Sequence, residues 1–394
     1  MRRFFGISPP LLVGVVVVVV LVACAAGFGA SWLVTNRAEA SRPTTFDVFW
    51  EAWDWVERDF YGPLPSPRER TYGAIRGVLE TLGDPYTVFL EPQPAQREKE
   101  RLQGFFGGIG AYIRRNEAGE IYLDPFRDGP AAQAGLQRGD VLLSVDGTPV
   151  TPEMNEGQVA ELIRGPVGTS VVLEVRRGGE VLRFTVVRQE IQVPSAEWRV
   201  LEEAPQVGYM RISNFTDRTP QEVAEGLQEL KAQGVQALVL DLRGNGGGLL
   251  QSAIAVADEF LDEGVILYEQ RRGRSEETYR SHPGGVATDL PLAVLVNGQT
   301  ASASEIVAGA IQDRGRGVLV GEKTYGKGSV QLIYPLSDGS SLHVTAAIWL
   351  TPNRHRLQGS GLTPDIEVSW QREAHEAGQD PQLEAALEYL LRER

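Results

Sequence analysis

Hydrophobic and polar residues along the chain follow different periods in successive segments. An uncharged apolar run fills residues 11–34, and a polar stretch that contains a proline follows it to residue 45. Apolar positions then recur at helical spacing in 46–62 and 69–83, which predicts two amphipathic helices, the second ending at Gly83. The aromatic residues of the first helix are more typical of packing than of a ligand site, so the pair is expected to brace the rest of the protein or a dimer partner.

The pattern changes again after residue 104. Short strands with turn signals extend to about residue 191, with one predicted helix at 152–165. From 192 to 370 apolar strands alternate with helical segments, which predicts an α/β core. The last residues, 381–394, have the spacing of an amphipathic helix that docks on the core or forms a dimer contact.

These periods predict a multidomain α+β protein. The expected segments are a cytoplasmic stub with a membrane anchor or signal (1–40), a helical region (41–100), a β-rich domain (104–191), an α/β core (192–370) and a C-terminal helix (371–394). At 394 residues and 42 % hydrophobic composition, the chain is long enough to bury more than one core.

The N-terminal apolar run predicts a membrane anchor. It exceeds the ~20 apolar residues that a membrane-spanning helix needs, and the basic residues before it place the N-terminus in the cytoplasm and the rest of the chain outside. A buried core helix is the alternative, which an uncharged run of this length disfavours. Residues 21–24 also match a lipoprotein signal, in which cleavage before Cys24 leaves a lipid anchor, but the apolar residues that continue to Val34 favour an uncleaved span. The expected location is the cell membrane, with the folded part on the extracytoplasmic side.

Charge and composition exclude other classes of function. The net charge of −14 argues against nucleic-acid binding, which requires a basic surface. The single cysteine excludes an intrachain disulfide. The four histidines, His282, His343, His355 and His375, show no metal-ligand spacing, so no metal site is expected.

Two segments carry candidate chemistry. In 299–313, Ser302 stands between alanines at the start of a predicted helix, and in 317–336, Lys327 stands between glycines in a loop that joins two predicted strands. A serine hydroxyl needs a neighbour that accepts its proton, and a lysine does this only when it is neutral, with its pKa lowered from about 10.4 toward about 7 to 8. A loop that folds inward between the strands would bury Lys327 and lower its pKa. Gln331, four residues on, is placed to orient the amine.

Backbone amides at two places are suited to an oxyanion. The amide after Ser302 lies at the positive end of the following helix, and Gly247 and Gly248 belong to a glycine-rich turn (239–250) between a strand and a helix. Each element also has an ordinary interpretation: Ser302 as a helix cap, Lys327 as a solvated turn residue, and the turn as a phosphate loop, although its spacing fits neither a dinucleotide fingerprint nor a P-loop. Only their combination predicts nucleophilic catalysis.

The chain resembles the carboxyl-terminal processing proteases, the S41 family of serine peptidases, over most of residues 45–370. The matching segments are LGDPYTVFLEP (82–92), FGGIGAYI (106–113), GPAAQAGLQRGDVLLSVDG (129–147), LIRGPVGTSV (162–171), VGYMRISNF (207–215), DLRGNGGG (241–248), TASASEIVAGAIQD (300–313) and GEKTYGKGSVQ (321–331). The resemblance implies a crotonase-like α/β protease core and serine endopeptidase activity without a cofactor.

The family pattern also implies a role for individual residues. Ser302 matches the nucleophile, Lys327 the general base and Gln331 the supporting polar residue, whereas Ser304 matches a residue of the helix start. The oxyanion hole is implied to consist of the backbone amide of Ala303 and a glycine of the turn, Gly248 in preference to Gly247.

Residues 104–191 resemble a PDZ module. Their FGGIGAYI segment implies a carboxylate-binding loop followed by a strand edge, which captures a peptide C-terminus by β-addition. The implied peptide-binding residues are Gly107, Gly108, Ile109, Gly110 and Ala111. The helix at 152–165 would form the other groove wall, and Arg164 matches a position that couples the module to the active site in some family members, with an ordinary surface arginine as the alternative.

The expected function is that of a membrane-anchored serine endopeptidase with a Ser-Lys dyad. It would cleave exported proteins and recognise their C-terminal region through the PDZ-like module, with a homodimer and an activating partner protein as open alternatives for its assembly. Two rival classes are a non-enzymatic peptide-binding scaffold and a small-molecule acyl enzyme or ligand binder with a crotonase-like core. The second lacks a nucleotide or coenzyme A signature and does not account for the PDZ-like module.

Overall fold

The structure is a computed structural model that describes residues 46–392, and the chain divides into two units, residues 1–71 and 72–394. The apolar run at 11–34 lies outside the described residues, and with it the predicted anchor, the signal alternative and Cys24. From residue 46 to residue 392, no helix combines the length and the apolar character that a bilayer span requires. The predicted anchor therefore stays a prediction.

The described part of the first unit contains helix α2 (Asp47–Asp59) and the beginning of α3 (Pro67–Glu80), which continues into the second unit. Both helices occur where the apolar spacing predicts them. Glu57 of α2 forms an ion pair with Arg70 of α3. No residue of α2 is buried, and large apolar side chains in and beside it are exposed, so the packing role predicted for the aromatic stripe also stays a prediction.

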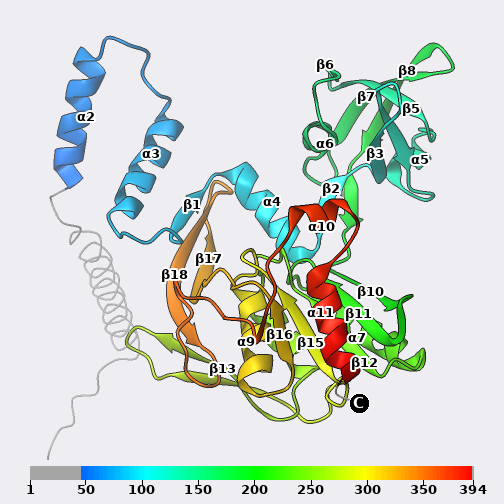
Figure 1. Cartoon of the computed structure of the whole chain (residues 1–394). Helices are drawn as coiled ribbons and strands as arrows, with labels where there is room; N and C mark the ends of the chain where they lie inside the picture. Colours follow the sequence, from blue (N-terminus) through cyan, green and yellow to red (C-terminus); the bar gives the residue numbers. More distant parts are fainter. Residues whose placement is uncertain (1–45, 393–394) are drawn as a thin grey trace, which may run out of the picture. The chain divides into compact units, whose positions relative to one another are not determined.

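The core of the second unit is a six-stranded sheet in the order β10-β11-β12-β15-β16-β19 (Figure 1). Its strands are β10 (Ala196–Leu201), β11 (Ala204–Ile212), β12 (Ala237–Asp241), β15 (Leu292–Val296), β16 (Val318–Gly321) and β19 (Ile366–Glu367). β10 pairs antiparallel with β11, and all other neighbours are parallel. Every residue of β12 and β15 is buried, which explains why these strands read as continuous apolar runs.

Helices pack on both faces of this sheet. On one face lie α7 (Thr219–Ala232), α8 (Leu250–Asp258) and α9 (Ala303–Asp313). They cover side chains such as Leu240 and Val294, whereas Val239 and Leu295 point to the other face, as the two-residue period of a strand requires. There α11 (Pro381–Arg392) packs against β12, β15 and β16 (Figure 1). The docking predicted for the C-terminal helix is confirmed.

The parallel strands bring the chemically interesting segments together. β12, β15 and β16 run in the same direction, so the loops at 242–249, 297–302 and 322–328 all leave the carboxyl edge of the sheet. The side chains and amides singled out in the sequence belong to these loops, or to the elements that directly follow them. Open α/β sheets bind ligands at this edge.

A second, antiparallel sheet borders the same region. It has the order β1-β18-β13-β14, with β17 paired to β18. Its strands are β1 (Val88–Leu90), β13 (Gly264–Arg271), β14 (Glu277–Ser281), β17 (Ser329–Pro335) and β18 (Ser341–Leu350). α4 (Pro92–Gln103) follows β1, and α10 (Arg372–Glu376) precedes α11. The loop that contains Lys327 thus runs from β16 of one sheet to β17 of the other.

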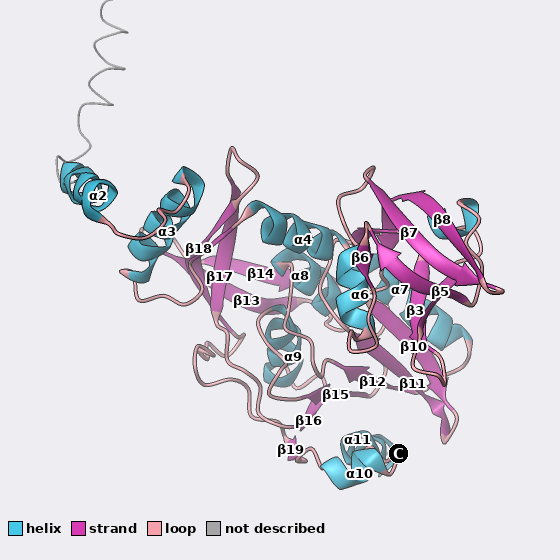
Figure 2. Ribbon diagram, turned by 90° about the horizontal axis from the view of Figure 1, so that it is seen from above, coloured by secondary structure: helices cyan, strands magenta, loops and turns pink. Residues whose placement is uncertain are grey.

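A β-rich module with its own apolar core is inserted between α4 and β10. β2 (Phe105–Gly108) and β9 (Gln189–Gln192) pair at its neck, where the chain enters and leaves. The rest of the module comprises β3 (Ala111–Arg115), β4 (Ile121–Pro125), α5 (Pro130–Gln133), β5 (Asp140–Val145), β6 (Thr148–Pro149), α6 (Glu156–Ile163), β7 (Ser170–Arg177) and β8 (Glu180–Val187). In the order β3-β4-β5-β7-β8, β3 is an edge strand, and α6 lies beside it (Figure 2).

Helix α6 is shorter than the predicted helix at 152–165. Its N-cap is Asn155, whose side chain accepts a hydrogen bond from the Gln158 amide at 2.9 Å, while the Gln158 side chain accepts one from the Asn155 amide at 2.8 Å. This reciprocal cap fixes the start of the helix at Glu156, four residues later than the predicted start at residue 152.

Candidate active site

One cavity of about 200 Å³ lies at the carboxyl edge of the six-stranded sheet. It is lined by the catalytic and oxyanion candidates Ser302, Ala303, Gly248, Lys327 and Gln331. These residues come from three loops, the start of α9 and strand β17. The structure therefore brings together the segments that the sequence singled out separately.

Ser302 occupies a sharp turn between β15 and α9. Its φ of 56° and ψ of −116° resemble the first central position of a type II′ turn, which strongly favours glycine. A side chain held in this conformation signals a constraint from the surrounding structure. The neighbouring Ser304 is fully buried, and its Oγ donates to the Asn245 carbonyl at 2.9 Å, so Ser304 has a structural contact rather than a place in the cavity.

Glu305 connects the loop of Ser302 to the loop of Lys327. Its carboxylate is fully buried and accepts four hydrogen bonds. Oε1 accepts from Thr324 Oγ1 at 2.6 Å and from the Gly326 amide at 2.7 Å, and Oε2 accepts from the amides of Ser302 and Lys327 at 2.8 Å each. Glu305 was not among the predicted site residues, although the Ser-x-x-Glu spacing of a capping box was a signal for it in the sequence.

The amine of Lys327 is half-buried within the cavity. Burial lowers the pKa of Lys327, and the positive charge of Arg101 lowers it further, while the negative charges of Glu98 and Asp84 act in the opposite direction. The lowering effects prevail. Nζ also lies 5.0 Å from the ring centroid of Tyr86, so an aromatic face borders the amine. The cation–π contact with Tyr86 stabilises the charged amine. Burial has the larger effect, and the lowered pKa favours the neutral amine that a general base requires.

Gln331 shares the cavity with Lys327 but is bonded elsewhere. Its Nε2 donates to Ser329 Oγ at 2.9 Å and to Thr345 Oγ1 at 3.3 Å. These partners belong to β17 and β18. Ser329 and Thr345 therefore orient the Gln331 side chain in this structure, and the amine of Lys327 does not.

Two further ionisable residues, neither of them predicted to belong to the site, line the same cavity. Nε2 of buried His343 lies 2.9 Å from Oε2 of Glu98. This contact lowers the pKa of Glu98, which therefore carries a negative charge near Lys327. The two residues are far apart in the sequence, and neither stands in a motif, so no local signal pointed to them.

The glycine-rich turn packs directly against Ser302. A Cβ atom on Gly247 would lie 2.9 Å from both the Ala301 carbonyl oxygen and Ser302 Cβ, and one on Gly248 would lie 2.1 Å from the Phe215 carbonyl oxygen. Only glycine allows this approach.

The two glycines differ in what their amides do. The Gly247 amide donates to Asn245 Oδ1 at 2.9 Å and is thereby occupied. The amides of Gly248 and Ala303 donate no hydrogen bond to any of residues 46–392. The arrangement favours Gly248 over Gly247 as an oxyanion donor.

Asn245 ties this turn to the start of α9. Its side chain is fully buried, and Nδ2 donates to the Ile212 carbonyl at 2.9 Å. Its own carbonyl accepts from the Ala301 amide at 3.0 Å and from Ser304 Oγ. Asn245 thus links the glycine-rich turn to the loop before α9.

No cluster of His, Cys, Asp and Glu in the described part of the chain has the makeup of a metal site.

The five predicted peptide-binding residues follow one another through the neck and edge of the β-rich module. Gly107 and Gly108 belong to β2, and the Gly107 carbonyl accepts from the Gly165 amide at 3.2 Å. Ile109 and Gly110 form the next loop, and their amides donate to no other described residue. Ala111 begins the edge strand β3. Two open amides therefore lie next to an open strand edge.

Arg164 lies away from the Ser302 cavity. It caps the C-terminus of α6, its guanidinium carbon is 4.4 Å from the Phe106 ring centroid, and it contacts Glu161 at 3.3 Å. Arg164 lines a larger cavity of about 860 Å³. Arg101 and Gly246 line both cavities, so the two adjoin.

Comparison with known proteins agrees with this architecture. The model of peptidase family S41 matches residues 206–368, and that of the PDZ domain matches residues 126–177. The carboxyl-terminal-processing protease of Synechocystis sp. is 37 % identical over 381 residues, which cover 93 % of this chain and 88 % of the relative. The carboxy-terminal processing protease of Bacillus subtilis is 33 % identical over 342 residues, with 85 % and 70 % covered. A solved structure assigned to the S41 proteases, from Bacteroides fragilis, has a TM-score of 0.53 over 86 % of this chain and 95 % of that one, at 16 % identity, which shows a common fold. The chain therefore belongs to the S41 family of serine peptidases and is a carboxyl-terminal processing protease with a PDZ domain.

Proposed function

We propose that this serine peptidase cleaves peptide bonds with a dyad of Ser302 and Lys327. One observation carries the proposal: the two side chains line the same cavity as the open amides of Ala303 and Gly248. The lowered pKa of Lys327 supports a neutral amine at the start of the reaction. The buried Glu305 holds both catalytic loops through their backbones.

The first half of the reaction forms an acyl-enzyme. Lys327 Nζ takes the proton of Ser302 Oγ while Oγ forms a bond to the scissile carbonyl carbon, and the amides of Ala303 and Gly248 stabilise the negative oxygen. The tetrahedral intermediate then collapses. Lys327 gives its proton to the leaving nitrogen, the C–N bond breaks, and Ser302 carries the acyl group.

In the second half, water repeats the attack on the ester. Lys327 takes a proton from the water as its oxygen bonds to the acyl carbon, and then returns a proton to Ser302 Oγ as the ester bond breaks. Gln331 is the proposed supporting residue. For this role its amide would turn from Ser329 toward Lys327, and Oε1 would accept from the amine.

The PDZ domain is the proposed receptor for the substrate C-terminus. The amides of Ile109 and Gly110 are placed to bind a carboxylate, and the β3 edge can pair with an extended peptide. Peptides that end in a free carboxylate are expected to bind more tightly than the same peptides with a C-terminal amide, as measured by calorimetry. Equal affinity would exclude carboxylate capture by this loop.

Arg164 is the proposed link between peptide binding and catalysis, because it borders a cavity that adjoins the active-site cavity. We expect Arg164→Ala to bind a C-terminal peptide as the wild type does, but to lose the change in turnover that the peptide causes. A variant with an unaltered response would leave Arg164 as a surface residue.

The proposed location is the cell membrane, with residues 11–34 as an uncleaved anchor and exported proteins as substrates. The support is the length and uncharged character of this run and the basic residues before it. Fractionation of cells that express Cys24→Ser separates the two anchors. An uncleaved span gives a wild type and a variant of the same length, whereas a lipoprotein signal gives a processed wild type that is shorter than the unprocessed variant.

Digestion of casein by the full-length chain in detergent tests the dyad. Ser302→Ala and Lys327→Ala are expected to be inert, and Lys323→Ala, which removes an exposed lysine of the same loop, is expected to cut as the wild type does. If Lys327→Ala keeps wild-type turnover, the amine is not the base. If Ser302→Ala does, the nucleophile is another residue.

A further inference from the structure

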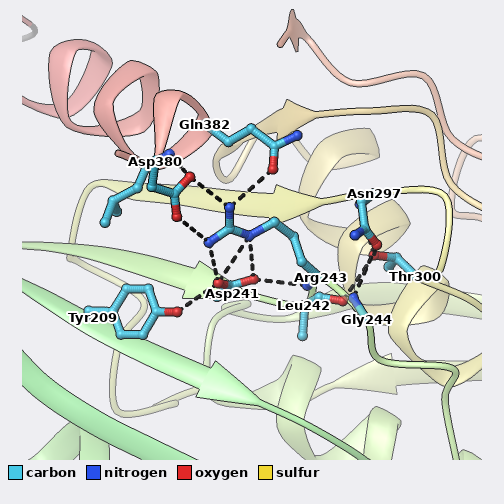
Figure 3. Close-up of polar contacts among 10 residues, drawn as sticks. Tyr209, Asp241, Leu242, Arg243, Gly244, Asn297, Thr300, Asp380 and Gln382 are labelled. Carbon is cyan, nitrogen blue, oxygen red and sulfur yellow. Dashed lines mark hydrogen bonds and ion pairs between the residues drawn. The ribbon is translucent and has the colours of Figure 1, made fainter. Parts of the chain in front are cut away.

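Arg243, at the start of the glycine-rich turn, is bound by residues at the start of helix α11 (Figure 3). Its Nη1 and Nη2 donate to Oδ1 and Oδ2 of Asp380 at 2.8 Å each, and Nη1 also donates to Gln382 Oε1 at 3.0 Å. On the opposite side, Nε and Nη2 donate to the Asp241 carboxylate at 3.0 and 2.6 Å. The guanidinium is therefore held between two carboxylates, with paired bonds of fixed geometry to each.

The residues that bind Arg243 are themselves fixed. Asp380 directly precedes α11, and its Oδ1 also accepts from the Leu383 amide of the first turn at 3.1 Å. Gln382 is buried, and its Nε2 donates to the Val368 carbonyl at 2.8 Å. Because α11 packs its apolar side on the six-stranded sheet, the carboxylate that meets Arg243 is presented by a docked helix.

Asp241, the more buried partner of Arg243, cannot readily replace the contact that Asp380 makes. The Asp241 side chain is 2 % exposed, compared with 37 % for Asp380. Asp241 also accepts from Tyr209 Oη at 2.6 Å and from the Arg243 amide at 2.9 Å. Burial alone would lower the pKa of Arg243, but hydrogen bonds to Asp241 and Asp380 raise it, so the arginine is charged in the folded protein.

The residues that directly follow Arg243 in the sequence belong to the candidate active site. The Gly244 amide donates to Asn297 Oδ1 at 3.1 Å, in the loop that ends at Ser302, and Figure 3 shows this contact beside the arginine. Asn245 then bonds to Ala301, and Gly248 carries the open amide. A displacement of Arg243 would therefore also shift the backbone of Gly244 and Asn245, and with it the positions of the Gly248 amide and of Ser302.

We propose that Asp380 is a positioning residue for catalysis. By holding Arg243, the first turn of the C-terminal helix fixes the glycine-rich turn and the Gly248 amide in it. The inference rests on the oxyanion role proposed for Gly248. Turnover would then depend on the contact between Asp380 and Arg243 at the N-terminus of α11, although neither residue touches the substrate.

The test compares Asp380→Asn with Glu384→Gln in the full-length enzyme. Asp380→Asn keeps the size of the side chain but turns an amino group toward Arg243. Glu384→Gln removes the same charge from the same turn of α11, at an exposed position that has no bond to Arg243. We expect kcat of Asp380→Asn to fall roughly 10-fold with little change in KM, since the oxyanion contact is made in the transition state. Glu384→Gln is expected to match the wild type.

Two further readouts separate positioning from loss of structure. The inhibition constant of a peptide aldehyde, whose adduct with Ser302 places an oxygen in the oxyanion hole, is expected to rise by about the same factor as kcat falls. Asp380→Glu, which restores a carboxylate, is expected to recover part of kcat. If Asp380→Asn does not fold, kcat and the inhibition constant are measured on Asp380→Glu instead.

A wild-type kcat in Asp380→Asn, or a loss confined to KM or to thermal stability, would overturn the inference. Ser302→Ala is assayed in parallel. If it remains active, the proposed dyad fails whatever Asp380 does. If it is inert and Asp380→Asn turns over normally, only the positioning role fails.

Discussion

The backbone amides of Ser302 and Lys327 donate to the same carboxylate oxygen, Oε2 of Glu305, at 2.8 Å each. The proposed nucleophile and base are thus held through their main chains by one buried anion. Their separation depends on this carboxylate more than on any contact between the two side chains.

Replacement of Glu305 by Gln should impair both activity and stability. Glutamine offers one oxygen to donors that now use two, so at least one buried donor would face an amino group. We expect kcat to fall by about 10² and the free energy of unfolding to fall by about 1–3 kcal/mol. Peptide hydrolysis and urea unfolding measure the two effects. The exposed Glu373→Gln serves as control, and equal behaviour of the two variants would refute the bridging role.

The pH dependence of kcat/KM should respond in opposite directions to two charge changes near Lys327. Activity requires the neutral amine, so kcat/KM rises with pH through the pKa of Lys327. Glu98 raises this pKa and Arg101 lowers it. Glu98→Gln should therefore move the acid limb to lower pH, and Arg101→Gln should move it to higher pH. A stopped assay across about pH 5 to 10, from the end of carboxylate titration to the start of lysine titration, measures both shifts.

The control for this pair is Lys99→Gln, which removes an exposed charge from the same helix and is expected to leave the limb in place. The Arg101 shift should also shrink as salt is added, because its side chain is 56 % exposed. Shifts of the same sign in the two variants would show that Lys327 does not set the acid limb.

Alanine at two glycines of the turn should have unequal effects. Gly248 has a φ of 148°, and a Cβ there would lie 2.1 Å from the Phe215 carbonyl oxygen, whereas a Cβ on Gly246 would meet nothing within 4 Å. We expect Gly248→Ala to lose about 10²- to 10³-fold in kcat, the size of effect seen when an oxyanion donor is lost. Gly246→Ala should keep most of its kcat and change stability by less than about 0.5 kcal/mol. A fully active Gly248→Ala enzyme would remove this amide from the mechanism.

The backbone at Ser302 should be strained in any variant that keeps a side chain. Ser302→Ala and Ser302→Gly both lack the hydroxyl, but only glycine adopts a φ of 56° with a ψ of −116° at low cost. We expect Ser302→Gly to be roughly 1 kcal/mol more stable than Ser302→Ala, as measured by chemical denaturation. The opposite order would mean that the turn relaxes once the hydroxyl is absent.

The strands and the loops of the candidate site could be predicted because their signals are local. The three strands that precede these loops, β12, β15 and β16, read as apolar runs, and the shared direction of parallel strands brings Ser302, Lys327 and Gly248 to one edge. The resemblance to a known family identified the same residues. The start of α6 was predicted four residues too early, since its cap at Asn155 outweighs the weaker apolar spacing before it.

The contacts that support these loops could not be read from the sequence. Glu98 and His343, or Arg243 and Asp380, approach each other only because separate elements pack side by side. Whether Gly247 or Gly248 offers a free amide depends on the buried side chain of Asn245, which no spacing rule specifies. Local patterns thus indicate which residues can react, while long-range packing determines which of them are held in place.

Helix α11 comes later in the chain than the loops of the candidate site, and this order has a consequence for biosynthesis. Residues 366–392 supply the edge strand β19, the cover of one face of the sheet and the outer partner of Arg243. A ribosome-bound chain that has not yet released these residues lacks all three, so its apolar sheet face is open and its glycine-rich turn is held from one side only. The protease should therefore gain full activity only after α11 has been synthesised and has packed on the sheet.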